Sequence, residues 1–108
     1  MILSTTDTIP QTEIIKNIGI ITGNSVISKQ ILQDILGRVK TLVGGEIPYF
    51  AKLLTKARDD AMHRLELAAE QSGADAVINV RLTTHTIMDT SAEVLAYGTA
   101  VKTKHKNG

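Results

Sequence analysis

The chain has 108 residues and a formal charge of +1 from 12 basic and 11 acidic side chains. This suits one domain with a modest core and gives no electrostatic reason to expect nucleic acid or an anionic membrane, while an aromatic content of 3% leaves few platforms for stacking bases. The chain contains no cysteine, which excludes disulfides, thiolate metal ligands and a cysteine nucleophile.

The amino-terminal segment, an irregular opening that includes Pro10, lacks the basic and apolar regions of a secretory signal peptide. The longest uncharged run, Asn17 to Ser28, falls short of the roughly 20 apolar residues that span a bilayer. We therefore expect a cytoplasmic protein with a single domain over residues 1–108.

An isoleucine-rich segment from Glu13 to Thr22 is typical of a β-strand. Its isoleucines fall on both faces, Ile14, Ile18 and Ile20 on one and Ile15 and Ile21 on the other. Apolar residues on both faces indicate a strand that is covered on both sides. In so small a chain, a partner subunit is one way to cover the second side.

Two helices are expected next. The first runs from a cap at Ser28 to about Leu42, and Gly44-Gly45 ends it. The second runs from Glu46 to Ser72, roughly 40 Å at about 1.5 Å per residue, and Gly73 is placed to take a left-handed conformation after its last turn. Its apolar residues recur at steps of three or four, at Ile47, Phe50, Leu54, Ala57, Ala61, Leu65 and Ala68.

Two further strands follow, from Ala76 to Met88 and from Glu93 to Lys102, joined by the turn residues Asp89-Thr90-Ser91. Alternation puts Ile78, Val80 and Leu82 on one face of the first and Asn79, Arg81, Thr83 and His85 on the other. The order β-α-α-β-β predicts an α+β domain in which a three-stranded antiparallel sheet packs on the long helix.

The sheet face opposite the helix is expected to carry Val77, Ile15 and Tyr97. Such a face is too apolar to be left in water, which favours a homo-oligomer.

Short motifs from the first strand to the last carry a family resemblance. They are Thr22-Gly23-Asn24, Gly44-Gly45-Glu46 with Tyr49, Ala57-Arg58 with Ala61 and Arg64, Gly73-Ala74-Asp75-Ala76-Val77, and Gly98-Thr99-Ala100-Val101. In this order they resemble the YbjQ-like family, small bacterial and archaeal proteins of unknown function labelled "putative heavy-metal-binding". The resemblance implies a dodecin-like subunit, a ring-shaped homo-oligomer that is a pentamer, and a divalent metal cation as ligand.

The best metal candidate is one face of the second helix, where Asp59, His63, Glu66 and Glu70 are spaced by 4, 3 and 4 residues. An imidazole among carboxylates suits a divalent cation, with His63 and either Asp59 or Glu66 as ligands. The alternative is an ordinary solvated face of an amphipathic helix.

The other candidate functional residues have simpler interpretations. His85 shares a strand face with Arg81, and ring symmetry would repeat it around an axis, but a lone strand histidine is more often a surface residue. His105 lies in a basic tail that is typical of a solvated terminus. No nucleophile motif is present. We expect a non-enzymatic oligomer that binds a metal cation or another small ligand; the alternative is a structural ring that docks another protein.

Overall fold

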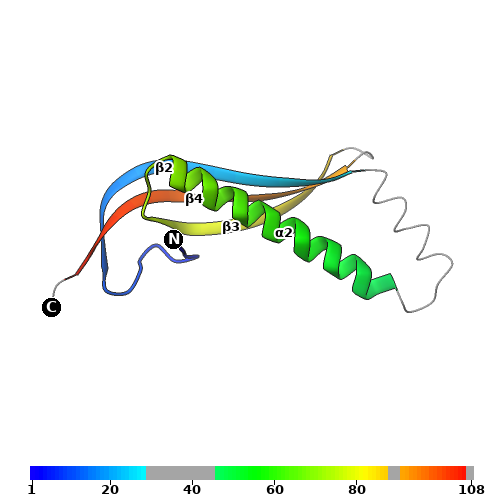
Figure 1. Ribbon diagram of the computed structural model, residues 1–108, viewed down its shortest axis with the longest axis horizontal. Coiled ribbons are helices and arrows are strands. Elements are labelled where there is room, and N and C mark those ends of the chain that lie inside the picture. Colours follow the sequence, from blue (N-terminus) through cyan, green and yellow to red (C-terminus); the bar gives the residue numbers. More distant parts are fainter. Residues whose placement is uncertain (29–45, 88–90, 107–108) are drawn as a thin grey trace.

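The computed structural model describes residues 1–28, 46–87 and 91–106. In chain order the elements are β1 (Ile2–Leu3), β2 (Thr12–Ser28), α2 (Glu46–Gln71), β3 (Ala76–Ile87) and β4 (Ser91–His105). The helix lies obliquely across one face of a long, curled sheet (Figure 1). This confirms the α+β class. The first predicted helix lies outside the described residues apart from Ser28, which is the last residue of β2.

The three predicted antiparallel strands are present, and the amino-terminal segment adds a short fourth one. The strand order is β1-β3-β4-β2, with β1 parallel to β3 and β4 antiparallel to both of its neighbours. The segment continues along the β3 edge, where Val80 N–H donates to Ser4 O (2.9 Å) and Asn79 N–H to Thr6 O (3.0 Å). The prediction of an irregular opening is confirmed for residues 4–11, which form no helix or strand, but Ile2–Leu3 pair with β3 and the segment supplies backbone partners for that edge.

Strands β2 and β4 extend beyond their predicted bounds and stay in register as far as the pair Ser28–Ser91. In the added part of β2, the buried positions are Gly23, Ser25 and Ile27, and they alternate with exposed ones. Two of these three carry no apolar side chain, so hydrophobic alternation could not reveal the strand.

Helix α2 confirms its prediction and packs unusually close to β2. Its buried positions recur every fourth residue, at Ala57, Ala61, Leu65 and Ala69. A Cβ atom added to Gly23 would lie 2.2 Å from the backbone nitrogen of Leu65 and 2.4 Å from the carbonyl oxygen of Ala61. The predicted stripe ended at Ala68, whereas the structure continues it to Ala69.

The carboxyl end of α2 is a Schellman cap, as the glycine predicted. Gly73 has a φ of 82°, its N–H donates to Glu70 O (3.1 Å), and Ala74 N–H donates to Ala69 O (3.0 Å). The cap leads the chain from the end of α2 directly into β3.

A bulge at Asn79 interrupts the alternation of β3. Asn79 has a φ of 53°, and the pairing with β4 shifts between Ile78 and Arg81. As a result, Val77 and Val80 both pack into the core under α2, while Ile78 packs on the opposite face. The predictions that Ile78 and Val80 share a face and that Val77 faces away from the helix are both wrong, because one extra residue reverses the alternation.

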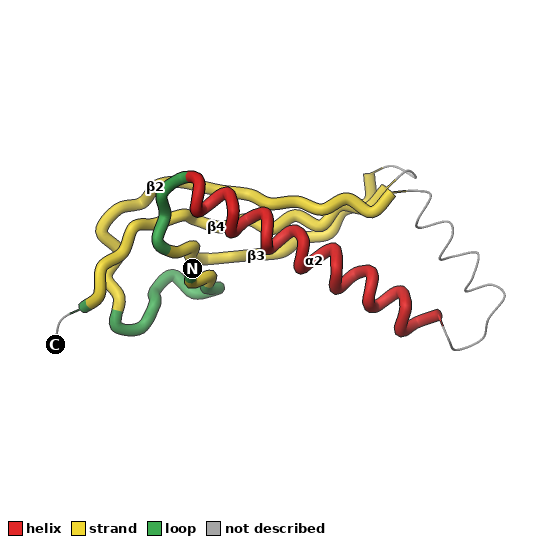
Figure 2. Tube along the Cα trace, in the orientation of Figure 1, coloured by secondary structure: helices red, strands yellow, loops and turns green. Residues whose placement is uncertain are grey.

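The sheet face turned away from α2, the outer face, is partly covered by the chain itself. Ile9 from the loop between β1 and β2 packs with Ala76, Ile78 and Val101, and Figure 2 shows that loop beside this end of the sheet. The rest of the outer face carries exposed or half-buried side chains: Thr22, Asn24 and Val26 of β2, Arg81, Thr83 and His85 of β3, and Glu93, Leu95 and Tyr97 of β4.

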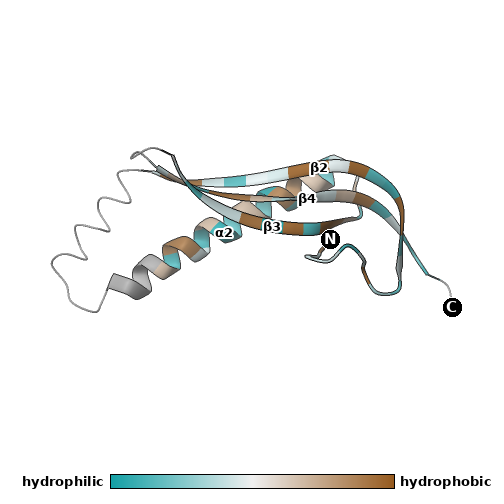
Figure 3. Ribbon diagram, turned by 180° about the vertical axis from the view of Figure 1, so that it is seen from behind, coloured by the Kyte–Doolittle hydropathy of each residue, from teal (hydrophilic) through white to brown (hydrophobic). Residues whose placement is uncertain are grey.

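Viewed from behind, β2 and β3 carry hydrophobic stretches along their length (Figure 3). Among the described helical residues, none form a segment long and apolar enough to cross a membrane. The outer face and the solvent side of α2 are therefore the surfaces on which a functional site has to be sought, together with the groove between helix and sheet.

Candidate functional site

The predicted metal ligands lie on the solvent side of α2. Asp59, His63 and Glu70 are exposed and Glu66 is half-buried. The Glu66 carboxylate lies 3.7 Å from the amino-terminal ammonium of Met1, which competes with a cation for it. No group of three or more His, Asp or Glu side chains that could share one ion occurs in the part of the chain that the structure describes. Metal binding by this face stays a prediction.

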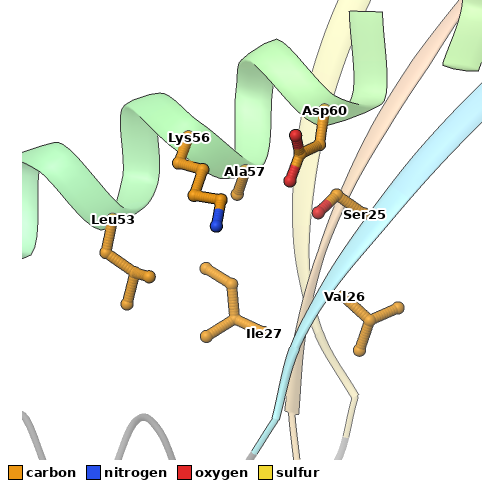
Figure 4. Close-up of a pocket in the computed structure, with 7 residues that line it drawn as sticks. All are labelled: Ser25, Val26, Ile27, Leu53, Lys56, Ala57 and Asp60. Carbon is orange, nitrogen blue, oxygen red and sulfur yellow. The ribbon is translucent and has the colours of Figure 1, made fainter. Parts of the chain in front are cut away.

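A small pocket of about 140 Å³ opens between α2 and β2 (Figure 4). Lys56 and Asp60 reach toward it from the helix, and the largely buried Ser25 lies on the strand side. Its other lining residues are Val26, Ile27, Leu53 and Ala57. Pockets for organic ligands are typically about 300–1,000 Å³, so this one suits only an ion or a group of a few atoms.

A polar connection crosses from α2 to the outer face through β2. The guanidinium of Arg64 donates to the backbone carbonyl of Asn24. The side-chain amide of Asn24 donates in turn to Oε2 of Glu93 (3.2 Å). The close approach of helix and strand brings this backbone carbonyl within reach of the guanidinium. Arg64 thus ties the helix to the strand.

The outer face brings together two side chains that the sequence left apart. His85 lies directly opposite Glu93 in the antiparallel register of β3 and β4. The Nε2 atom of His85 lies 3.4 Å from the Thr83 hydroxyl. A turn centred on Thr90, as predicted, would have placed Leu95 opposite His85 instead. The register, which no local sequence pattern specifies, creates this pair.

Two other predicted features have ordinary surroundings. His105 is exposed and pairs with Thr12 in the register of β4 and β2. Beside it, Lys104 Nζ lies 3.5 Å from Glu13 Oε2, and both side chains are more than half exposed. Exposed ion pairs of this kind contribute about 0–1 kcal/mol. The basic tail therefore continues the sheet, where a frayed terminus was expected.

Comparison with known proteins decides the family. A family model described as "Putative heavy-metal-binding", YbjQ_1, matches residues 1–104. The chain belongs to the YbjQ-like family. It is 52% identical over 104 residues to a UPF0145 protein of Psychromonas ingrahamii, covering 96% of this chain and 99% of the relative. It is 46% identical over 102 residues to a UPF0145 protein of Archaeoglobus fulgidus, covering 94% of each.

The fold has a solved counterpart. A protein of unknown function from Pediococcus pentosaceus, a member of the DUF74 family, superimposes with a TM-score of 0.64 over 96% of this chain and 98% of that one. The two are 16% identical. At that identity the likeness shows a shared fold only, and the YbjQ-like relatives named above carry no assigned activity in their names.

Proposed function

We propose that this YbjQ-like chain is a non-enzymatic subunit of a ring-shaped homo-oligomer, a pentamer, which binds a metal cation or another small ligand. The observation that carries the proposal is the open edge of β2. This strand of 17 residues is last in the sheet order, and its outer edge faces no strand in the described part of the chain. Long open edges invite pairing with another chain, and monomeric proteins avoid them.

The side chains of β2 support association as well. Ile20 is 82% exposed, and Ile15 and Val26 are also more than half exposed. Each buried large aliphatic side chain contributes roughly 1.5–3 kcal/mol relative to an exposed one, so covering these three would stabilise an interface substantially.

The subunit's shape points the same way. Its radius of gyration is 17.6 Å and its extents are 61 × 26 × 17 Å, whereas a compact chain of this length has a radius of about 13 Å. Its accessible surface is 7224 Å², against about 5,900 Å² for a typical monomer of its mass. An elongated subunit with excess surface is expected when neighbouring copies complete the fold.

The bound species follows from the family label and the available side chains. The α2 face with Asp59, His63, Glu66 and Glu70 is the sequence-based candidate for a cation. The outer face offers another in His85 and Glu93. Both sets combine imidazole with carboxylate, which suits ions such as Zn²⁺, Cu²⁺ and Ni²⁺.

The alternative function is a ring that docks another protein and has no ligand of its own. One observation favours it: Tyr97, 39% exposed, lies directly opposite Arg81 on the outer face. Tyrosine and arginine are enriched in protein interfaces. Under this alternative, the purified protein binds no metal.

Light scattering during size-exclusion chromatography tests the interface. We expect the wild type to elute as an oligomer and Ile20→Lys to shift it toward monomer, because a charge would be buried without a partner. Leu67→Lys is the matched control, since Leu67 is exposed by 41% on α2, and it should leave the oligomer intact. If Ile20→Lys elutes like the wild type, β2 does not form the interface.

A further inference from the structure

The polar pair on the outer face has the geometry of a cation site. His85 and Glu93 occupy directly opposite positions on neighbouring antiparallel strands. Side chains at such positions leave the same face of the sheet, with Cβ atoms about 4.5–5.5 Å apart. A nitrogen of the imidazole and an oxygen of the carboxylate can therefore reach one common point above the sheet.

Each of the two donors is oriented by a neighbour. Oε2 of Glu93 accepts a hydrogen bond from the Asn24 amide (3.2 Å), which fixes one oxygen of the carboxylate. Nε2 of His85 lies 3.4 Å from the Thr83 hydroxyl. When Nε2 carries the proton and donates to that hydroxyl, Nδ1 keeps its lone pair for a metal. Metal-binding histidines are commonly oriented by such a second hydrogen bond.

The surroundings of the pair favour it over the helix face. Glu93 is contacted by a neutral amide, whereas Glu66 on α2 lies 3.7 Å from the amino-terminal ammonium. A fixed positive charge competes with a cation, and a neutral amide does not. Among the described residues, no direct ion pair joins His85 to Glu93, so the lone pairs of both side chains stay available to a cation.

We infer that His85 and Glu93 bind a divalent cation of the zinc, copper or nickel class through Nδ1 and a carboxylate oxygen. The inference rests on the proposed function, because it assigns a place to the cation of that proposal. Two protein ligands are fewer than the three or four of closed zinc sites, and water fills the other positions. The exposed His85 and the half-buried Glu93 leave room for it. The ion is therefore exchangeable.

Calorimetry with Zn²⁺ on the full chain, purified without a polyhistidine tag, tests the site. We expect His85→Ala and Glu93→Gln each to weaken zinc binding about tenfold or more. The matched controls His105→Ala and Glu13→Gln lie outside both candidate cation sites and should change it by less than about twofold. All four substitutions are at exposed or half-buried positions, and circular dichroism will verify that each variant is folded.

Nitrogen-15 NMR of the histidine rings gives a second readout, because zinc should shift Nδ1 of His85 and leave His63 unchanged. If the wild type binds zinc and His85→Ala binds it equally well, the inference is wrong while the proposed function stands. Loss of binding in His63→Ala alone assigns the ion to the helix face and also overturns the inference. If the wild type binds no zinc tighter than about 100 μM, the inference and the cation part of the proposed function both fail.

Discussion

Gly23 sets the distance between α2 and β2, and Gly23→Ala should therefore destabilise the fold severely. The added Cβ would lie 2.2 Å from the nitrogen of Leu65, 2.4 Å from the oxygen of Ala61 and 2.8 Å from the carbonyl carbon of Arg64. All three atoms belong to the helix backbone, so no side-chain rotation relieves the overlap. Ordinary contacts at a Cβ are 3.4–4 Å, which means that the whole helix has to move away by about 1 Å.

Overpacking of a core typically costs about 1–3 kcal/mol. Moving the helix also loosens its contacts with the core under Ala57, Leu65 and Ala69, so we expect about 3 kcal/mol for Gly23→Ala. Urea denaturation followed by circular dichroism measures this, at one fixed protein concentration because association would add to the apparent stability.

The exposed neighbour Thr22 provides the matched control, since Thr22→Ala should change stability by less than about 0.5 kcal/mol. If Gly23→Ala unfolds within about 0.5 kcal/mol of the wild type, the close approach of α2 to β2 is not a feature of the protein in solution.

Two further substitutions test the backbone devices that shape β3. Asn79→Val should lower the free energy of unfolding in urea by about 1–3 kcal/mol, because a β-branched residue resists the φ of 53° at the bulge. Asn79→Gly should be at least as stable as the wild type. Equal stabilities of the Val and Gly variants would refute the bulge. Gly73→Ala should lower the free energy of unfolding by about 1 kcal/mol, since an alanine is strained at the φ of 82° of the helix cap. An unchanged denaturation midpoint would contradict that cap.

Local patterns predicted the long helix and its end well. The apolar spacing of α2 and the single glycine after it are strong local signals, and both agree with the structure. The sheet was less predictable, because its details depend on tertiary contacts. One residue, Asn79, carries the bulge that reverses the faces of Val77 and Ile78 relative to Val80, and an asparagine in a strand does not by itself predict a bulge.

In the candidate sites, too, local features could be predicted from the sequence and features that depend on tertiary contacts could not. The spacing of Asp59 and His63 along one helix is visible in the sequence, because helical geometry alone relates them. The opposition of His85 and Glu93 depends on the register of two strands, and the contact between Arg64 and Asn24 spans 40 positions of sequence. Interactions of this kind need the folded chain.

The mass of the native particle tests the central proposal most directly. Native mass spectrometry of the untagged protein at micromolar concentration should show a closed homo-oligomer, a pentamer of about 59 kDa from five subunits of 11.7 kDa. A particle of one subunit mass under those conditions would contradict the proposal, since the open edge of β2 and its exposed isoleucines would then be left in water.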